Sequence, residues 1–172
     1  MKAVQRGEVR AGSGLERRWR DRRQAAGPRA RSARPSISSA LRQEAPALYD
    51  ETAAVRAWLA AIGAEEGLLT LFIRHTSASL LIQENADPDV HSDLLAAFER
   101  LAPRGAHYVH AVEGPDDMPA HIKSALTATS LAVPVQAGRM LLGTWQGIYV
   151  AEHRDRPHRR EVVMHYLGTF AG

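Results

Sequence analysis

The chain has 172 residues, of which 45% are hydrophobic and 24% charged, a composition typical of one globular domain with its own core. It contains no cysteine, which excludes a disulfide scaffold, a thiolate-ligated zinc finger, an iron–sulfur protein and a cysteine nucleophile. Its longest apolar runs, such as residues 67–73, are far shorter than the roughly 18 residues of a membrane span. We therefore expect a cytoplasmic protein without a membrane partner.

The positive charge is concentrated at the start of the chain. Residues 1–35 carry ten Arg and one Lys against three acidic residues, a net charge of +8, which leaves the other 137 residues at −5. This segment has few apolar side chains, so it cannot bury enough surface to offset the entropy that ordering would cost. We predict that residues 1–35 form a disordered, Arg-rich extension and that residues 36–172 form a single domain.

Three functions of this extension compete with the simple interpretation that it has no chemical role. It could bind nucleic acid, act as a targeting segment, or lie upstream of the natural start codon. A secretory signal is not expected, because no apolar stretch of about 7–15 residues follows the basic start. For the domain itself we expect no nucleic-acid partner.

The first elements of the domain are a helix and two strands. Asp50 is a typical N-cap, apolar residues then recur at helical spacing, and Gly63 is suited to a helix end, so residues 51–63 predict a helix. The apolar, β-rich runs at residues 68–74 and 77–83 predict strands. The polar residues between these runs predict a bend.

A second helix and an irregular segment follow. Asp87 is a good cap before Pro88, and apolar side chains at helical spacing predict a helix up to residue 101 that packs one face on a sheet. Residues 108–110 predict a brief strand, and residues 113–117 predict an acidic loop.

The last third of the chain predicts a helix and three strands. Pro119 suits the first turn of a helix that continues through residues 120–129. Residues 131–136, 139–152 and 160–167 predict strands joined by short turns. Strands paired by short turns, with helices between groups of them, indicate an α+β domain of largely antiparallel packed β-sheets and about three helices.

Polar residues surround the bend between the first two strands. His75, Thr76 and Ser77 lie at the bend, and Glu84 and Asn85 end the second strand. Hydroxyls and nearby backbone N–H groups donate hydrogen bonds to phosphate oxygens, so this segment is a candidate anion site. The alternative is structural, because the same residues also suit a bend and a turn before a helix.

Two histidines, His110 and His121, flank the acidic loop. Their separation is not a compact metal-binding spacing, but a loop that returns to a helix start can bring both imidazoles together with a carboxylate. The alternative is that each is a hydrogen-bonded structural residue. The glycines at residues 143 and 147 are unusual inside a predicted strand and indicate either a bulge, with Trp145 in the core, or a close approach of a ligand.

Four segments of the sequence resemble, in order, the motifs of the YjbQ-like family, which carries the label secondary thiamine-phosphate synthase. They are HTSAS at residues 75–79, ENADP at 84–88, EGPDDMPAHIKS at 113–124, and GR with LGTWQGI between residues 138 and 148. The resemblance covers about residues 48–168. It departs from the family at residues 127–130, where TATS stands in place of a Leu-Gly-x-Ser pattern, so the helix-to-strand turn lacks its glycine.

The resemblance implies a small α+β fold, a homotrimer and a weak thiamine-phosphate synthase activity. This reaction joins a pyrimidine diphosphate to a thiazole phosphate and releases pyrophosphate, so the expected ligand is a small phosphorylated metabolite. The alternative is a metal- or metabolite-binding protein of unassigned function. The polar site residues of the family match this sequence at His75, Thr76, Ser77, Glu84, Asn85, Asp93, His110, Asp117, His121, Thr144, Gln146 and Glu152.

From these matches we expect three groups of functional side chains. Catalytic roles are expected for His75, Glu84, Asp93 and Glu152. Substrate contacts are expected from Thr76, Ser77, Asn85, Arg139, Thr144, Trp145 and Gln146. One divalent metal ion is expected to be shared by His75, His110 and His121, with Glu84, Asp93 or Glu152 as the carboxylate partner. Imidazoles favour zinc, whereas water and carboxylate ligands also suit magnesium or manganese.

Overall fold

The computed structural model describes residues 31–32, 36–43 and 46–172, with the backbone alone for residues 36–43. The elements in chain order are β1 (Arg31–Ser32), β2 (Ser36–Gln43), β3 (Ala47–Asp50), α2 (Thr52–Ala61), β4 (Ala64–Ile73), β5 (Ala78–Glu84), α3 (Pro88–Leu101), α4 (Asp117–Leu126), β6 (Ser130–Gln136), β7 (Arg139–Met140), β8 (Gln146–Glu152) and β9 (His158–Phe170). Most of the predicted disordered extension therefore lies outside the described residues. Its two described residues pair with β9.

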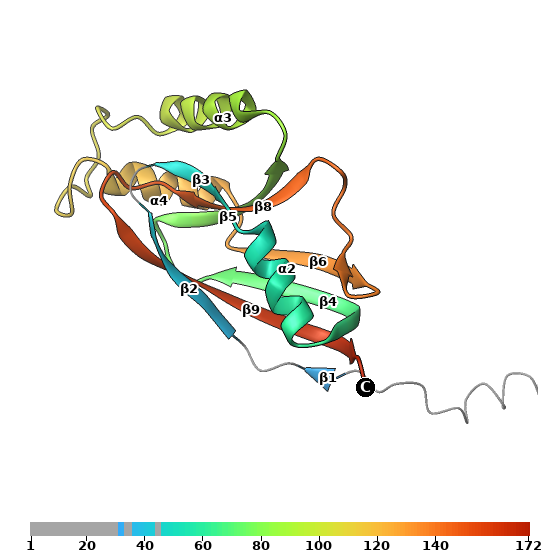
Figure 1. Cartoon of the computed structure of the whole chain (residues 1–172). Coiled ribbons are helices and arrows are strands. Elements are labelled where there is room, and N and C mark those ends of the chain that lie inside the picture. Colours follow the sequence, from blue (N-terminus) through green and yellow to red (C-terminus); the bar gives the residue numbers. More distant parts are fainter. Residues whose placement is uncertain (1–30, 33–35, 44–45) are drawn as a thin grey trace, which may run out of the picture.

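Two antiparallel sheets form the domain (Figure 1). The larger sheet has the order β1-β9-β4-β6-β7, and β2 also pairs with β9. The smaller sheet has the order β3-β8-β5. Helix α2 contacts β4, β7 and β8, whereas α3 contacts α4 and β3. The prediction of an α+β fold with three helices and antiparallel sheets is confirmed for the part of the chain that the structure describes.

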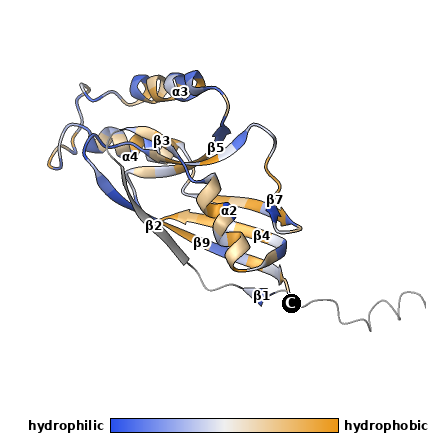
Figure 2. Cartoon of the chain, in the orientation of Figure 1, coloured by the Kyte–Doolittle hydropathy of each residue, from blue (hydrophilic) through white to orange (hydrophobic). Residues whose placement is uncertain are grey.

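The core lies between the two sheets and α2. Strand β4 shows the alternation that places it there, because Leu69, Leu71 and Ile73 are at most 1% exposed while Leu68 and Phe72 point to the other face. Figure 2 shows a hydrophobic stretch of β4 next to α2. The buried hydrophobic side chains of the core are Val55, Leu59, Ala64, Leu69, Leu71, Ile73, Ala78, Leu80, Val133, Val135, Ile148, Val150, Val162, Met164 and Tyr166.

The predicted helix ends are partly confirmed. The Asp50 carboxylate accepts a hydrogen bond from the backbone N–H of Thr52 at 2.8 Å, and Gly63 has the positive φ of 65° that suits a helix end. The Asp87 carboxylate accepts from the backbone N–H of Asp89 at 2.9 Å. Helix α4 begins earlier than predicted, at Asp117, because the last acidic residue of the expected loop is the first residue of the helix and Asp116 is its N-cap.

Two other predictions were wrong. Residues 108–110 form a loop, since none of these described residues pairs with a strand and Val109 is fully exposed. The strand predicted over residues 139–152 is divided into β7 and β8, because Gly143 turns the chain by bonding with Gln146. Helix α3 packs one face toward the three-stranded sheet, as predicted, since it contacts β3 and the His91 ring meets the Tyr149 ring of β8 edge-on, although none of its residues, all of which are described, is fully buried.

The turn from α4 into β6 replaces the missing glycine with a side-chain bond. The Thr127 hydroxyl lies 2.8 Å from the carbonyl of Lys123 and 3.3 Å from that of Ser124. It thereby satisfies carbonyl groups that the end of a helix leaves without partners. No helix in the described part of the chain is long and apolar enough to cross a membrane.

Candidate functional site: a histidine–aspartate cluster

The start of α4 and the loop before it bring three potential metal ligands together, which we call the His–Asp–His cluster. His110 lies in the loop, Asp117 is the first residue of α4, and His121 follows one helical turn later. The Asp117 Oδ2 atom lies 2.7 Å from His110 Nε2 and 3.3 Å from His121 Nε2. One ligand atom from each side chain lies within 4.8 Å of the other two.

A buried arginine holds the carboxylate of this cluster in place. Arg154, which follows β8, is paired with Asp117 Oδ1, and its Nε donates to Asp116 Oδ2 at 2.9 Å. Its Nη2 donates to the carbonyl of Glu113 at 3.0 Å, so one guanidinium connects the loop to the helix start. Burial by itself raises the pKa of Asp117, but the hydrogen bond from His110 and the charge of Arg154 lower the pKa below its usual value. Asp117 is therefore a carboxylate at neutral pH.

The hydrogen bonds of His121 indicate which ring nitrogen is available to a cation. Nδ1 lies 3.0 Å from the carbonyl oxygen of Thr76, and because a carbonyl only accepts, Nδ1 carries a proton. In the neutral ring, Nε2 is then an acceptor that lies 3.3 Å from another acceptor, Asp117 Oδ2. Two acceptors at this distance repel each other unless a cation lies between or beside them. A divalent ion, or a proton on Nε2, satisfies this arrangement.

The donor set of the cluster fits a divalent ion such as zinc. Two imidazoles and a carboxylate are a common ligand set of catalytic zinc sites, which keep a further position for water or substrate. Ligand atoms about 2.0–2.2 Å from one ion lie roughly 3 Å apart, close to the separations from Asp117. The side chains of His110 and His121 are 43% and 33% exposed, so the cluster is open to solvent.

Of the three histidines expected to share a metal, the structure brings His110 and His121 together and leaves His75 outside the cluster. The His75 Nε2 accepts a hydrogen bond from the backbone N–H of Glu161 on β9 at 2.7 Å, so this nitrogen is occupied. Burial lowers the pKa of His75 below its usual value, which favours the neutral ring that this bond needs. The carboxylate of the cluster comes from Asp117.

The bend with the expected phosphate contacts lies next to the cluster. Thr76, whose carbonyl meets His121, and Ser77 line an open hollow of about 440 Å³ together with His75. Arg160 donates from Nη1 to the Ser77 hydroxyl and from Nη2 to the Ser77 carbonyl, both at 3.2 Å. The bend is therefore held by β9 on one side and by α4 on the other.

One of the expected catalytic carboxylates, Glu152, is fully buried at the end of β8. Its Oε2 accepts from Arg160 Nε at 2.7 Å, and its Oε1 accepts from Arg160 Nη2 at 2.5 Å and from the backbone N–H of Arg154 at 2.9 Å. Both oxygens are thus engaged within the protein. In this structure Glu152 positions Arg160, which in turn holds the bend at Ser77.

The remaining expected site residues lie elsewhere in the fold. At the opposite end of the three-stranded sheet are Glu84, Asn85, Thr144, Trp145 and Gln146. In the β5–β8 register Gln146 pairs with Glu84, and Glu152 lies six residues further along β8, about 20 Å away. Exposed on other elements are Asp93 of α3 and Arg139 of β7. A single copy of the chain therefore does not bring these residues to the His–Asp–His cluster.

Sequence reasoning missed the two arginines that organise the site, Arg154 and Arg160. The signal was present, because five of the eight residues 153–160 are Arg or Asp, a density unusual for a simple turn. Arg160 also shares the inward face of β9 with Val162, two residues later. An arginine at such a position needs a buried carboxylate as its partner.

The chain matches one protein-family model, described as UPF0047 protein YjbQ-like, over residues 38–169. A UPF0047 protein of Synechocystis sp. is 54% identical over 122 residues, which cover 70% of this chain and 83% of that protein. The UPF0047 protein YjbQ of Salmonella typhimurium is 50% identical over 99 residues, which cover 58% of this chain and 72% of that protein.

Solved structures agree with this assignment. A YjbQ/UPF0047-family protein of Clostridium acetobutylicum superposes with a TM-score of 0.67 at 32% identity and covers 78% of this chain and 99% of that chain. A protein of unknown function from Sulfolobus solfataricus has a TM-score of 0.70 at 21% identity, covers 83% of this chain and 99% of that chain, and supports the fold. The resemblance inferred from four sequence motifs is confirmed, and the chain belongs to the UPF0047 (YjbQ-like) family.

Proposed function

We propose that this protein binds a divalent metal ion through His110, Asp117 and His121 and holds a phosphorylated metabolite in the adjacent hollow. The observation that carries the proposal is the pair of acceptors, His121 Nε2 and Asp117 Oδ2, which face each other at 3.3 Å while Nδ1 is engaged by Thr76. A divalent ion would satisfy both atoms and would replace the proton through which His110 Nε2 now bonds with Asp117 Oδ2 at 2.7 Å. A divalent ion, when bound, supplies positive charge for phosphate oxygens.

The reaction that we propose is a slow synthesis of thiamine phosphate, as the resemblance to the family label implies. The thiazole nitrogen forms a bond to the methylene carbon of the pyrimidine, and the carbon–oxygen bond to the diphosphate breaks. The electron pair of that bond leaves with pyrophosphate. The hydroxyls of Thr76 and Ser77 line the hollow and are available to donate to phosphate oxygens. We expect slow turnover, because the sequence has no glycine-rich phosphate loop to add further donors.

A second candidate is a metal- or metabolite-binding protein without turnover. One observation favours it: the carboxylates around the cluster are held by cations within the chain. Glu152 is paired with Arg160, and both Asp116 and Asp117 are paired with Arg154. Among the described residues at this site, these ion pairs leave few carboxylates that could act as an acid or a base.

The change His121→Ala tests both candidates against the control His107→Ala, which alters an exposed loop histidine. Replacing a residue that only hydrogen-bonds to a metal ligand lowers metal affinity by about 10–100-fold. Since His121 is itself a ligand in this proposal, we expect His121→Ala to lower metal affinity by more than about tenfold and to abolish product formation. Metal content is measured by plasma mass spectrometry. Thiamine phosphate is followed by fluorescence after oxidation, with both phosphorylated precursors present.

The outcomes separate the candidates. Slow product formation by the wild type and by His107→Ala, but not by His121→Ala, supports the enzyme. Loss of metal in His121→Ala, with no product from any variant above a protein-free control, supports the binding protein instead. Unchanged metal content in His121→Ala contradicts the metal site and both candidates.

We also propose that the chain assembles as a homotrimer. The number of three copies is taken from the resemblance to the YjbQ-like family. On the outer face of the larger sheet, Leu68, Phe72 and Leu167 are 43%, 47% and 51% exposed, and Leu68 pairs directly with Leu167. A row of exposed apolar side chains on a sheet marks an interaction surface. Assembly also offers a way to bring the Glu84 end of one copy to the His–Asp–His cluster of another.

Light scattering tests this assembly. We expect the wild type to show three times the 18.8 kDa mass of the chain and Phe72→Asp to show a smaller mass, because a buried carboxylate would disrupt the apolar contact. As a control, Leu126→Asp on α4 should keep the wild-type mass. A wild-type monomer at working concentration would remove the proposal.

A further inference from the structure

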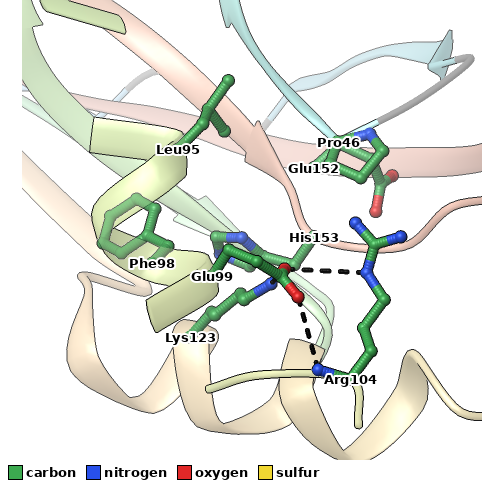
Figure 3. Close-up of a pocket in the computed structure, with 8 residues that line it drawn as sticks. All are labelled: Pro46, Leu95, Phe98, Glu99, Arg104, Lys123, Glu152 and His153. Carbon is green, nitrogen blue, oxygen red and sulfur yellow. Dashed lines mark hydrogen bonds and ion pairs between the residues drawn. The ribbon is translucent and has the colours of Figure 1, made fainter. Parts of the chain in front are cut away.

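A cavity of about 270 Å³ lies beneath α3 and is lined by residues of α3 and α4 (Figure 3). Leu95 and Phe98 of α3 form its apolar wall, while Lys123 of α4 and His153, which follows β8, contribute nitrogen atoms. The α3 residues that face it, Leu95 and Phe98, are half-buried, and the Phe98 ring meets the His153 ring edge-on. The cavity is open to solvent, so a ligand can reach it.

Lys123 gives this cavity a buried positive charge. The residue is 5% exposed, and it lies two residues after His121, about 200° around the helix, so the two side chains leave α4 on opposite sides. Among the residues that the structure describes, its ammonium group donates a hydrogen bond to Glu99 Oε2 at 2.8 Å. An ammonium group has three N–H donors, so Lys123 can bind more than this carboxylate.

The Glu99 carboxylate shows how an anion is held here. It accepts from Lys123 Nζ, from the backbone N–H of Arg104 at 3.3 Å, and lies 3.6 Å from Arg104 Nε (Figure 3). These three groups converge on one carboxylate, in the manner of an anion site. The Glu99 side chain is 41% exposed, so it can move into solvent and leave the three donors to another anion.

We propose that this cavity binds a small organic anion, whose carboxylate or phosphate takes the place of the Glu99 carboxylate on Lys123 and Arg104. The apolar part of the ligand packs against Leu95 and Phe98. The volume lies below the range of about 300–1,000 Å³ typical of pockets for drug-sized ligands, so the ligand is smaller than these. This site does not depend on the proposed metal or on the proposed reaction.

Calorimetric titration with phenyl phosphate and with benzoate tests the proposal and separates the two anion types. Glu99→Gln removes the competing carboxylate, so it should bind at least one probe about tenfold more tightly than the wild type, the gain expected for one charge-assisted hydrogen bond. Glu65→Gln makes the same change of charge at an exposed residue of β4 and should leave affinity unchanged. Inorganic phosphate should bind more weakly than phenyl phosphate, because it lacks the apolar part.

Further variants locate the anion. Adding Lys123→Met to Glu99→Gln should abolish the tenfold gain in affinity. If the variant with Lys123→Met does not fold, Arg104→Gln, at an exposed residue, is added to Glu99→Gln in its place and should reduce the gain. Adding His121→Ala to Glu99→Gln should keep the gain, which shows that the probe is not bound at the metal cluster. Equal affinities of Glu99→Gln and Glu65→Gln, a gain that survives both Lys123→Met and Arg104→Gln, or a gain lost with His121→Ala would each overturn the proposal.

Discussion

Replacing Glu152 with Gln is expected to lower the free energy of unfolding by about 3–5 kcal/mol, because it leaves the guanidinium of Arg160 buried without its counterion. The two residues are 0% and 3% exposed, and their contacts measure 2.5 and 2.7 Å. A charge at such a position has no access to water that could replace the lost carboxylate. The measurement is urea unfolding at neutral pH.

Strand β9, which carries Arg160, offers a matched control in the next residue. Glu161→Gln removes a carboxylate that pairs with Arg74 at 3.2 Å, where the two side chains are 38% and 54% exposed. Exposed pairs contribute about 0–1 kcal/mol, so this variant should be close to the wild type. If Glu152→Gln costs no more than Glu161→Gln, the buried pair does not have the role assigned to it.

Replacing both members of the buried pair distinguishes its charge from its packing. Glu152→Leu combined with Arg160→Met leaves no unpaired charge, so the double variant should lose less stability than Glu152→Gln. It should still disturb the site, because the guanidinium of Arg160 also binds the hydroxyl and carbonyl of Ser77. A double variant less stable than Glu152→Gln would show that the shape of the pair matters more than its charge.

His153 is expected to make the protein sensitive to mild acid. Burial lowers its pKa from 6.5 to about 4, with smaller contributions from the charges of Lys123 and Arg160. Between pH 6.5 and 4 the unfolded chain therefore binds more protons at this residue than the folded protein does. Since stability rises with pH wherever the unfolded state binds more protons, the free energy of unfolding should fall by about 3 kcal/mol as the pH is lowered through this window.

The variant His153→Gln isolates this effect. Gln can still meet the Ser79 hydroxyl, which lies 2.9 Å from His153 Nε2, but it does not titrate. Urea unfolding of both proteins at pH 7 and pH 4 should show a smaller loss for the variant, while His107→Gln, at an exposed residue, should behave as the wild type. Equal losses in the wild type and His153→Gln would contradict a neutral, buried His153.

The sequence predictions succeeded where the signal lies in neighbouring residues and failed where the structure depends on residues far apart in the chain. Strand β6 and helix α2 were found within a few residues, because apolar runs, helical spacing and the Asp50 side chain just before the helix are local signals, although the N-cap itself is Glu51. The strand expected at residues 108–110 failed for the opposite reason. Its apolar residues suit a strand, but a strand exists only where a partner supplies hydrogen bonds, and none of the described residues does so there.

The candidate site shows the same division. The i,i+4 spacing of Asp117 and His121 is readable once a helix is known to begin at Asp117, but that start was hidden by residues that also suit a loop. His75 was grouped with the other histidines from sequence. Its ring instead accepts a hydrogen bond from a backbone N–H of β9, 86 residues later, and no local sequence pattern indicates this contact.

The sequence by itself determined the α+β class, the approximate extents of α2 and β6 and the family, because each is encoded in periodicity, in apolar runs or in short contiguous motifs. Only the tertiary structure decided which charges meet. Arg154 and Asp117 are 37 residues apart, and Lys123 and Glu99 are 24 apart. Ion pairs form wherever folding leaves two opposite charges together in a place with little water, and chain topology rather than spacing sets that place.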